Sequence, residues 1–595
     1  MTLVAIVVGL WACVLVVDLY RIQSELRAGR SELQGLTVDR VDAAGGIGPL
    51  ADRADRHLRR ADHLAHASIG LAPLTLVPGL VGQVRGIQNL TAVTASLGHT
   101  ARHEADGLQH EIDRGTSSDR RLALLDDLAG ATQRIQTKVA AVHLDTRRVL
   151  LPPLSGARHQ LDRELAKVHR KLGDSRKTLA SMRTFLARDH LVLILGSNNA
   201  EMRGGNGMPL SAGVAHIHDG QIEMGGFVQT SDLWNPNGPV GDLPTDLLAT
   251  YGPRTGGFAI GQEWRETDVS PNFVESAPIY ARMAQRQGLG TVDSVMLVDA
   301  LSLRALVQAT GPITLNGVQY DANNIIQQVL NENYKRFGVI NGEVRDQRVD
   351  LQSELAKRAF DAFNTRSISP TKLASALLAV TPGRHLLAWS ADPSIQATWK
   401  RLGIDGGMRA DGMLVSTENT SANKIDYYLR PGIAIDVERD PTGNWLVTVA
   451  VVISDPVRTD TSPYIEGGTV GIPPGAYRTY LDLHLPGDAY NASNLSPNDA
   501  AAVWKKKFLK GARDPYPNNG FLQPGFATHG LDPPNKVVGS RYIVPLGTTR
   551  TVIVQFHLPA ASNHIVVLPS GRLNPQIWAF RGQIYSDAAQ FTIHW

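Results

Sequence analysis

Hydrophobic and polar positions divide the chain into four stretches with different periodicities. An uncharged apolar run occupies residues 3–17, and from residue 21 to 188 Leu, Val and Ile recur at spacings of three and four residues, as on packed helices. From residue 189 short apolar runs alternate with helical patterns, which is typical of an α/β domain. Beyond about residue 390, and most clearly after residue 426, Val, Ile, Thr and Tyr gather in short segments between turn signals, which predict strands.

These patterns predict a multidomain α+β chain. We expect a transmembrane anchor at residues 1–20, a helical stalk at 21–188, a central α/β domain at 189–390 and a β-rich domain at 391–595. The last domain fits a β-sandwich of immunoglobulin-like type that lacks the cysteine pair.

The first apolar run (LVAIVVGLWACVLVV, residues 3–17) predicts the anchor. A spanning helix needs about 20 residues, with roughly 17 as the lower limit, so the run spans only if flanking residues occupy the interfaces. No small-x-small cleavage site follows, which disfavours a signal peptide. An uncleaved anchor is the favoured interpretation, and a signal peptide and a buried core helix are the alternatives.

The stretch from residue 21 to 188 has few aromatic residues and too few large apolar ones for a compact globule, so paired long helices are expected. Residues 67–84 (ASIGLAPLTLVPGLVGQV) carry no charge and could form a second span. Pro73, Pro78 and the glycines instead predict a bent apolar turn that rests on the membrane or on neighbouring helices.

Composition limits the partners and the kinds of site that the chain can have. The 595 residues include 59 Lys and Arg against 56 Asp and Glu, a balance that gives no reason to expect a nucleic-acid partner. Cys13 is the single cysteine and lies in the apolar run. The sequence therefore excludes a disulfide framework, an all-cysteine metal site and a catalytic thiol outside that run.

A candidate binding loop follows the first predicted strand of the α/β domain. The apolar segment 190–196 leads into polar residues and glycines at 197–207 (SNNAEMRGGNG). Polar groups at the end of a buried strand, beside glycines that let backbone approach a ligand, suit an anion or sugar site. The loop is neither a Walker loop nor a dinucleotide fingerprint, and a purely structural turn is the alternative.

Residues 191–207 (LVLILGSNNAEMRGGNG) resemble the opening of the family called domain of unknown function 4012. Further stretches resemble its elements in the same order, namely residues 264–273 (WRETDVSPNF), 292–299 (VDSVMLVD), 306–312 (LVQATGP), 424–428 (KIDYY) and 477–481 (YRTYL). The chain departs from the family where Met208 and Pro209 follow the glycines in place of an aromatic residue. That family has no settled activity.

A strand that ends in Gly196 and Ser197 is followed in order by Arg203, by residues 306–312 (LVQATGP) and by an arginine-rich helix start. This order distantly resembles the LytR-CpsA-Psr phosphotransferases, and the resemblance implies a reaction. Those enzymes attach undecaprenyl-pyrophosphate-linked glycopolymers to peptidoglycan, with arginines on the pyrophosphate and acidic residues on a divalent cation. The resemblance implies catalytic roles for Arg203, Arg265 and Arg348, with Arg345 as an alternative to Arg348. It implies Glu201 and Asp268, with Asp346 as a further candidate, as ligands of Mg²⁺.

The ligand itself is expected to contact residues of the loop and of the second motif: Asn198, Asn199, Glu201, Gly204, Gly205 and Asn272. Each charged candidate has a structural alternative. Glu201 and Arg203 lie two apart and could belong to an ion-pair network, and the arginines at 345 and 348 could form a solvated helix start.

Two histidine groups could bind metal. His57, His63 and His66 fit a solvated helix face, while His216 and His218 lie two apart and share one face of a strand. A zinc site at the second pair would need a third ligand that the spacing does not identify, so exposed strand histidines are expected there. The motif Gly-x-Ser-x-Gly of serine hydrolases is absent.

Together with the patterns above, these resemblances imply a cell-envelope protein whose central domain binds a polyprenyl-linked glycan or cell-wall polymer. A glycopolymer phosphotransferase and a structural component of a surface assembly are the alternatives. The family resemblance places the protein in the cell membrane as a single-pass protein with its bulk outside, although Arg21, Arg27 and Arg30 favour the opposite orientation unless a basic segment precedes the run. Protein partners are expected on the stalk or the β-rich domain.

Overall fold

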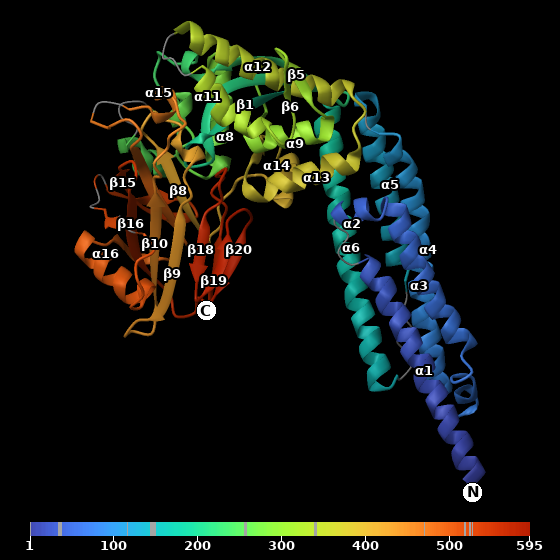
Figure 1. Ribbon diagram of the computed structural model, residues 1–595. Coiled ribbons are helices and arrows are strands. Elements are labelled where there is room, and N and C mark those ends of the chain that lie inside the picture. Colours follow the sequence, from blue (N-terminus) through green and yellow to red (C-terminus); the bar gives the residue numbers. More distant parts are fainter. Residues whose placement is uncertain are drawn as a thin grey trace. The chain divides into compact units, whose positions relative to one another are not determined.

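The computed structural model describes residues 2–33, 38–115, 117–142, 150–254, 259–337, 342–468, 471–516, 519–522, 525 and 527–595. The fold is mixed α/β and divides into two compact units (Figure 1). The first comprises Met1–Ala187 and Ser367–Ser375, and the second comprises Arg188–Arg366 and Ala376–Trp595.

The first unit is built from long helices. They are α1 (Thr2–Leu33), α2 (Val38–Ala43), α3 (Ile47–Ala67), α4 (Val81–Asp113), α5 (Arg121–Ala140) and α6 (Pro152–Ala187). Small residues let the helices approach closely: a Cβ added to Gly29 of α1 or to Gly98 of α4 would lie 2.8 Å from the Leu58 side chain of α3. This close packing explains why few large apolar residues suffice.

The predicted transmembrane helix is wrong. Among the residues that the structure describes, no helix combines the length and the apolar character that crossing a membrane requires. Helix α1 runs on through its charged half to Leu33, so the apolar run is one part of a longer helix. The run ends at Asp18, whose carboxylate accepts hydrogen bonds from Ser68 Oγ (2.7 Å) and Gly70 N (3.2 Å) in the turn after α3.

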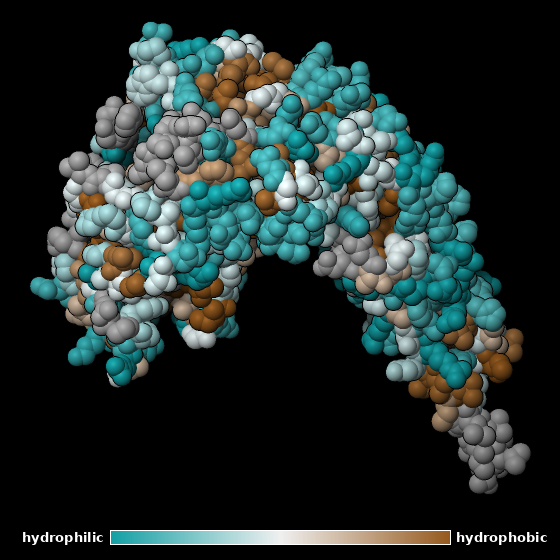
Figure 2. All heavy atoms as spheres, turned by 45° about the horizontal axis from the view of Figure 1, so that its top comes forward, coloured by the Kyte–Doolittle hydropathy of each residue, from teal (hydrophilic) through white to brown (hydrophobic). Residues whose placement is uncertain are grey.

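The uncharged segment 67–84 is the bent turn that its prolines predict. A 3₁₀ turn, η1 (Ala72–Leu76), lies between α3 and α4. Leu71 is buried with Ile22 of α1 in a small apolar cluster. Ile69 and Leu76 are 78% and 85% exposed, and Figure 2 shows apolar residues gathered near the N-terminal end of this unit.

A short segment from much later in the sequence completes the helical unit. Residues Ser367–Ser375 belong to it although the chain on both sides belongs to the second unit. Ile368 is 1% exposed, and Ser367 lies against Gly115, the residue that follows α4 and its cap. The segment then enters α13 (Pro370–Val380).

The second unit begins with a five-stranded sheet in the order β3-β2-β1-β4-β7. The strands are β1 (His190–Met202), β2 (Gly207–His218), β3 (Gln221–Gln229), β4 (Ser294–Val298) and β7 (Leu386–Ser390), and only β1 and β4 pair in parallel. Helices α8 (Phe273–Arg286), α9 (Ala300–Thr310), α12 (Gly342–Thr365) and α14 (Pro393–Leu402) accompany the sheet. Strand β1 is buried along nearly its whole length, which explains its continuous apolar run.

The C-terminal strands form two further sheets that share one apolar core. One has seven strands, with β12 (Tyr490–Asn494), β16 (Thr549–Leu558), β10 (Trp445–Ser454), β9 (Gly432–Arg439), β18 (Ile577–Phe580) and β19 (Gln583–Ser586) in order, and β13 (Asn519–Phe521) beside β16. The other has six, in the order β14 (Ala527–Asp532), β15 (Asn535–Val544), β11 (Tyr477–Leu485), β8 (Gly412–Asn419), β17 (His564–Val567) and β20 (Phe591–His594). The sandwich exceeds the seven to nine strands of the immunoglobulin type and contains parallel pairs, so that part of the prediction is wrong.

Buried polar contacts join the five-stranded sheet to the sandwich. The backbone N–H of Met202, at the end of β1, donates to Asp426 (3.1 Å). The same carboxylate, 1% exposed, accepts a hydrogen bond from Tyr477 Oη (2.9 Å) and pairs with Arg572 (3.0 Å). The predicted motif 424–428 therefore connects the two parts of one compact unit.

Candidate functional site

A cavity of about 630 Å³ lies at the end of β1 in the second unit, in the size range of ligand sites. Its walls come from β1, β2 and β3, from α9 and α12, and from two segments of the sandwich at residues 422–424 and 463–468, the second of which contains α15 (Pro463–Glu466). The cavity has an apolar wall and a group of charged and aromatic residues, which we call the cationic group: Arg348, Lys424, Tyr334 and Tyr464.

The apolar wall is built by both layers around the cavity. Its residues are Met208, Leu210 and Phe227 from the sheet, Leu303 and Leu306 from α9, Val329 and Leu330 from the π-helical turn η6 (Gln328–Glu332), and Ala356 and Phe360 from α12. Such a surface suits a hydrocarbon chain, because burying apolar ligand area against it releases about 25 cal/mol per Å².

Arg348 carries a charge that the described part of the protein leaves without a carboxylate partner. Its guanidinium carbon lies 5.0 Å and 4.3 Å from the ring centroids of Tyr334 and Tyr464, which are stacked at 5.5 Å with planes 6° apart. Nη2 donates to the Tyr464 hydroxyl (2.9 Å), while the buried Nη1 has no hydrogen-bond partner among the described residues. Arg348 is 6% exposed, so this is a buried cation.

Lys424 also lines the cavity, but its charge is compensated. Its ammonium forms a hydrogen-bonded ion pair with Glu201, and the two residues are 6% and 4% exposed. Burial alone would lower the pKa of Lys424, but the Glu201 carboxylate outweighs that effect and raises the pKa. The Lys424 ammonium is therefore charged at neutral pH, and it is the partner of Glu201.

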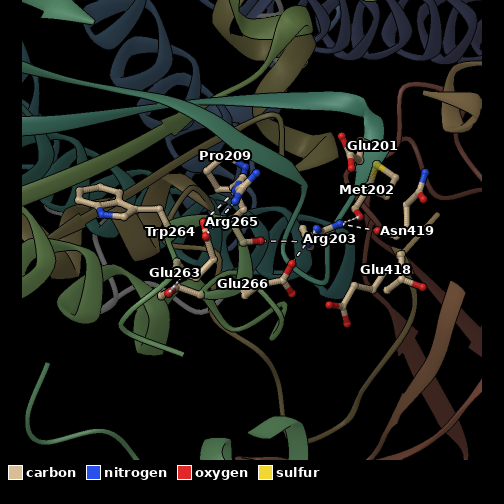
Figure 3. A network of polar contacts seen from close by, with 12 residues as sticks. Glu201, Met202, Arg203, Pro209, Glu263, Trp264, Arg265, Glu266, Glu418 and Asn419 are labelled. Carbon is tan, nitrogen blue, oxygen red and sulfur yellow. Dashed lines mark hydrogen bonds and ion pairs between the residues drawn. The ribbon is translucent and has the colours of Figure 1, made fainter. Parts of the chain in front are cut away.

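The two arginines near the loop are held by internal partners (Figure 3). Arg265 lines the cavity and donates to both carboxylate oxygens of Glu263, at 2.8 Å and 2.9 Å. Arg203 does not line it: its guanidinium pairs with Glu266 (3.1 Å) and donates to backbone carbonyls, including Asn419 O at 2.6 Å. Arg203 thus ties the end of β1 to the sandwich.

The three asparagines predicted to bind the ligand also differ in whether they line the cavity. Asn198 lines the cavity and donates to the Tyr334 hydroxyl (2.6 Å), which positions one ring of the cationic group. Asn199 is 1% exposed, does not line the cavity and donates to Asp299 (2.9 Å). Asn272 donates to the carbonyl of Pro533 (3.0 Å) in the sandwich, so it connects chain segments.

The glycines of the loop are required by packing against the chain itself. A Cβ at Gly204 would lie 1.9 Å from the carbonyl oxygen of Val269, and one at Gly205 would lie 2.4 Å from Asp268 Oδ1. Neither glycine lines the cavity. Their role as ligand contacts stays a prediction, and the structure offers a packing role in its place.

Gly204→Ala is therefore expected to destabilise the protein by about 1–3 kcal/mol, as overpacking of a tight site does. Gly226→Ala is the matched control, because a Cβ there meets nothing within 4 Å. Thermal unfolding of both variants measures the difference. Equal melting temperatures for the two variants would show that the loop accommodates a side chain at 204.

The predicted Mg²⁺ ligands do not fit a metal. Asp268 is fully buried, and burial raises its pKa well above the usual range despite the nearby Arg384 and Arg203, so burial favours the protonated carboxyl over the carboxylate that a metal needs. Glu201 is paired with Lys424. The side chains of Arg345 and Asp346 lie outside the described residues.

The fold is mixed α/β, and its cavity combines an apolar wall with charged side chains. Residues 187–334, about a quarter of the chain, match the model of a family described as "Protein of unknown function (DUF4012)". The matched stretch contains β1 to β4 and α9, hence much of the cavity wall. No curated protein and no solved structure matches the chain.

Proposed function

We propose that the cavity binds an amphiphile with an anionic head and a hydrocarbon chain, of the class of polyprenyl-phosphate-linked glycans or cell-wall polymer precursors. The observation that carries the proposal is Arg348, a buried guanidinium whose Nη1 has no partner in the described part of the chain and which lies in a cavity with an apolar wall. An unpaired buried charge costs several kcal/mol, and a phosphate bound to it would supply the missing acceptors.

The rest of the cavity supports the same ligand class. Leu303, Leu306 and Phe360 line a wall that would shield a hydrocarbon chain from water. The charges of Lys424 and Arg265 are balanced by Glu201 and Glu263, and the Asp299 carboxylate in the lining is bonded to His385 and to the first N–H groups of α9. Arg348 is therefore the one cation among the described lining residues that has no carboxylate partner. A single anionic head on an apolar chain matches that balance.

Phosphoryl transfer, which the resemblance to the LytR-CpsA-Psr enzymes implies, has less support. That chemistry needs several cations and a metal-bound carboxylate converging on one diphosphate. Here the Arg203 guanidinium, which does not line the cavity, is bonded to Glu266 and to backbone carbonyls, and burial raises the pKa of Asp268. Binding without transfer is the function that we propose.

Farnesyl diphosphate, a soluble short-chain polyprenyl diphosphate, tests the proposal by calorimetric titration into the full chain. Arg348→Gln is expected to weaken binding by about 10–100-fold, because a charge-assisted hydrogen bond contributes about 1.5–3 kcal/mol. Arg358→Gln is the matched control: it lies on the same helix, is exposed, and pairs with Glu354 at 2.7 Å.

Two partial ligands separate the contributions of head and chain. Farnesol lacks the charge and inorganic pyrophosphate lacks the chain, so each is expected to bind more weakly than farnesyl diphosphate. If pyrophosphate bound as tightly as farnesyl diphosphate, the apolar wall would make no contribution to binding. An affinity lowered equally by Arg348→Gln and Arg358→Gln would contradict the proposal.

A further inference from the structure

A second group of potential ligands lies on the hairpin of β2 and β3. The strands are joined at residues 219–220, where Asp219 (φ 45°) and Gly220 (φ 80°) are both left-handed, as a tight type I′ hairpin turn requires. That turn fixes the register, which places His216 directly opposite Glu223. His218 lies two residues from His216 and so shares its face of the sheet.

These three side chains approach one another closely. His218 Nε2 lies 3.3 Å from Glu223 Oε1, and His216 Nδ1 lies 4.0 Å from Glu223 Oε2. The two imidazole rings have centroids 4.8 Å apart. One ligand atom from each of the three residues lies within 4.8 Å of the others.

The separations are close to those of a tetrahedral metal site. Zinc–nitrogen and zinc–oxygen bonds of about 2.0–2.1 Å put neighbouring ligand atoms about 3.3 Å apart. The site therefore needs side-chain rotations that move atoms by about 1 Å, and the exposure of the side chains, 39% for His216 and 27% for His218, permits them.

Asp189 supplies a second, independent feature of metal sites. Its carboxylate lies 2.5 Å from His216 Nε2. A metal-binding histidine usually donates its other N–H to a carboxylate or carbonyl, which fixes the tautomer and the ring orientation. An Nε2–H that donates to Asp189 leaves the lone pair on Nδ1, the atom that faces Glu223.

We propose that His216, His218 and Glu223 bind one divalent ion of the zinc class, with water in the fourth position and Asp189 orienting His216. Two imidazoles and one carboxylate select zinc, cobalt, nickel or copper over magnesium and calcium, which prefer oxygen ligands. The expectation of exposed strand histidines is thereby revised, since the third ligand comes from the paired strand.

This site is separate from the cavity. Ser211, the nearest cavity-lining residue on β2, is five positions from His216, or about 16 Å along a strand. A metal here would join the tip of the hairpin to the residue before β1 through the bond between His216 and Asp189. The bound metal would therefore stabilise the sheet where β1 begins.

Titration of zinc into the full, untagged chain tests the proposal, with the visible spectrum of bound Co²⁺ reporting coordination. We expect one tightly bound ion and a tetrahedral cobalt spectrum. His216→Ala and His218→Ala should each weaken zinc binding by about 100-fold, and Asp189→Asn by about 10-fold, as loss of an outer partner does.

His564→Ala is the matched control. His564 is also a strand histidine, with Asp411 at 3.4 Å and the His594 ring at 5.7 Å, but no third ligand completes a cluster there among the described residues. Its loss should leave tight zinc binding unchanged. Zinc affinity that survives both His216→Ala and His218→Ala, or an absence of stoichiometric binding, would overturn the proposal and leave a His–Glu ion pair.

Discussion

Replacing Arg254 with methionine is expected to lower the free energy of unfolding by about 3–5 kcal/mol, the cost of breaking a buried ion pair from one side. Its side chain is fully buried, and Nη1 donates to both oxygens of Asp482, at 2.9 Å and 2.7 Å. Glu418 lies 3.9 Å from Nε. The substitution would leave two buried carboxylates without their cation.

Urea unfolding followed by tryptophan fluorescence reports on the second unit, which contains Arg254. Of the nine tryptophans, Trp11 alone belongs to the helical unit. Arg409→Met is the control: Arg409 pairs with Asp411 through two bonds of 2.9 Å, but the pair is exposed. Its loss should cost less than about 1 kcal/mol. Similar losses for both variants would mean that the buried pair adds nothing beyond an exposed one.

Glu418→Gln is expected to become more stable relative to the wild type as the pH rises. The difference between their free energies of unfolding should shift by about 2–3 kcal/mol in favour of the variant from pH 5 to pH 8. Burial raises the pKa of Glu418 from 4.5 to about 7, although Arg254 and Arg203 act in the opposite direction. A raised folded pKa means that the proton-linked stability is complete below pH 4.5 and is lost as the pH rises through 7. Glutamine cannot ionise and so avoids that loss.

Urea midpoints of both proteins at pH 5 and pH 8 give this difference. Other groups with shifted pKa values, such as His484 (lowered by burial to about 3) and Asp455 (raised by burial to about 6), titrate in both proteins and cancel. Glu354→Gln, at an exposed ion pair, should show no such change. A constant difference between wild type and Glu418→Gln across the range would show that Glu418 stays ionised in the fold.

Local patterns in the sequence predicted elements well where periodicity decides the structure. The apolar segment 190–196 lies within β1, and Trp445–Ser454, in the stretch whose Val, Ile, Thr and Tyr predict strands, is β10. The extension of β1 to Met202 was not predictable, because its last N–H is bonded to Asp426, far along the chain. The order of strands in the sandwich also depends on distant pairings that periodicity does not contain.

Part of the site was predictable in the same sense. Asn198, Glu201, Arg265 and Arg348 line the cavity, as expected from residues at strand and helix ends. Arg203 and Asp268 do not, since spacing gives residue type and position but not whether a neighbouring segment satisfies or buries the group. Lys424 belongs to the motif at residues 424–428, so its presence in the family pattern could be predicted. Its ion pair with Glu201 could not, because Glu201 lies in a distant segment of the chain.

The sequence patterns did not identify three residues of the candidate sites, namely Tyr334, Tyr464 and Glu223, and one reason explains all three. Each acquires its role from a contact across elements: the two rings stack on each other, and Glu223 reaches His216 through the hairpin register. The turn at residues 219–220 was the available signal for Glu223, because an Asp-Gly pair between alternating strands predicts a tight hairpin.

The segment Ser367–Ser375 gives the chain an unusual connectivity. The polypeptide passes between its two units after Ala187, after Arg366 and after Ser375. A protease that cuts only after Ala187 would produce two chains, and the C-terminal one would still carry the segment, with Ile368 buried, that completes the helical unit. The cleaved protein would then persist as a complemented pair of fragments, whereas a fragment expressed from residue 188 onward would present the same segment without the helices that cover it.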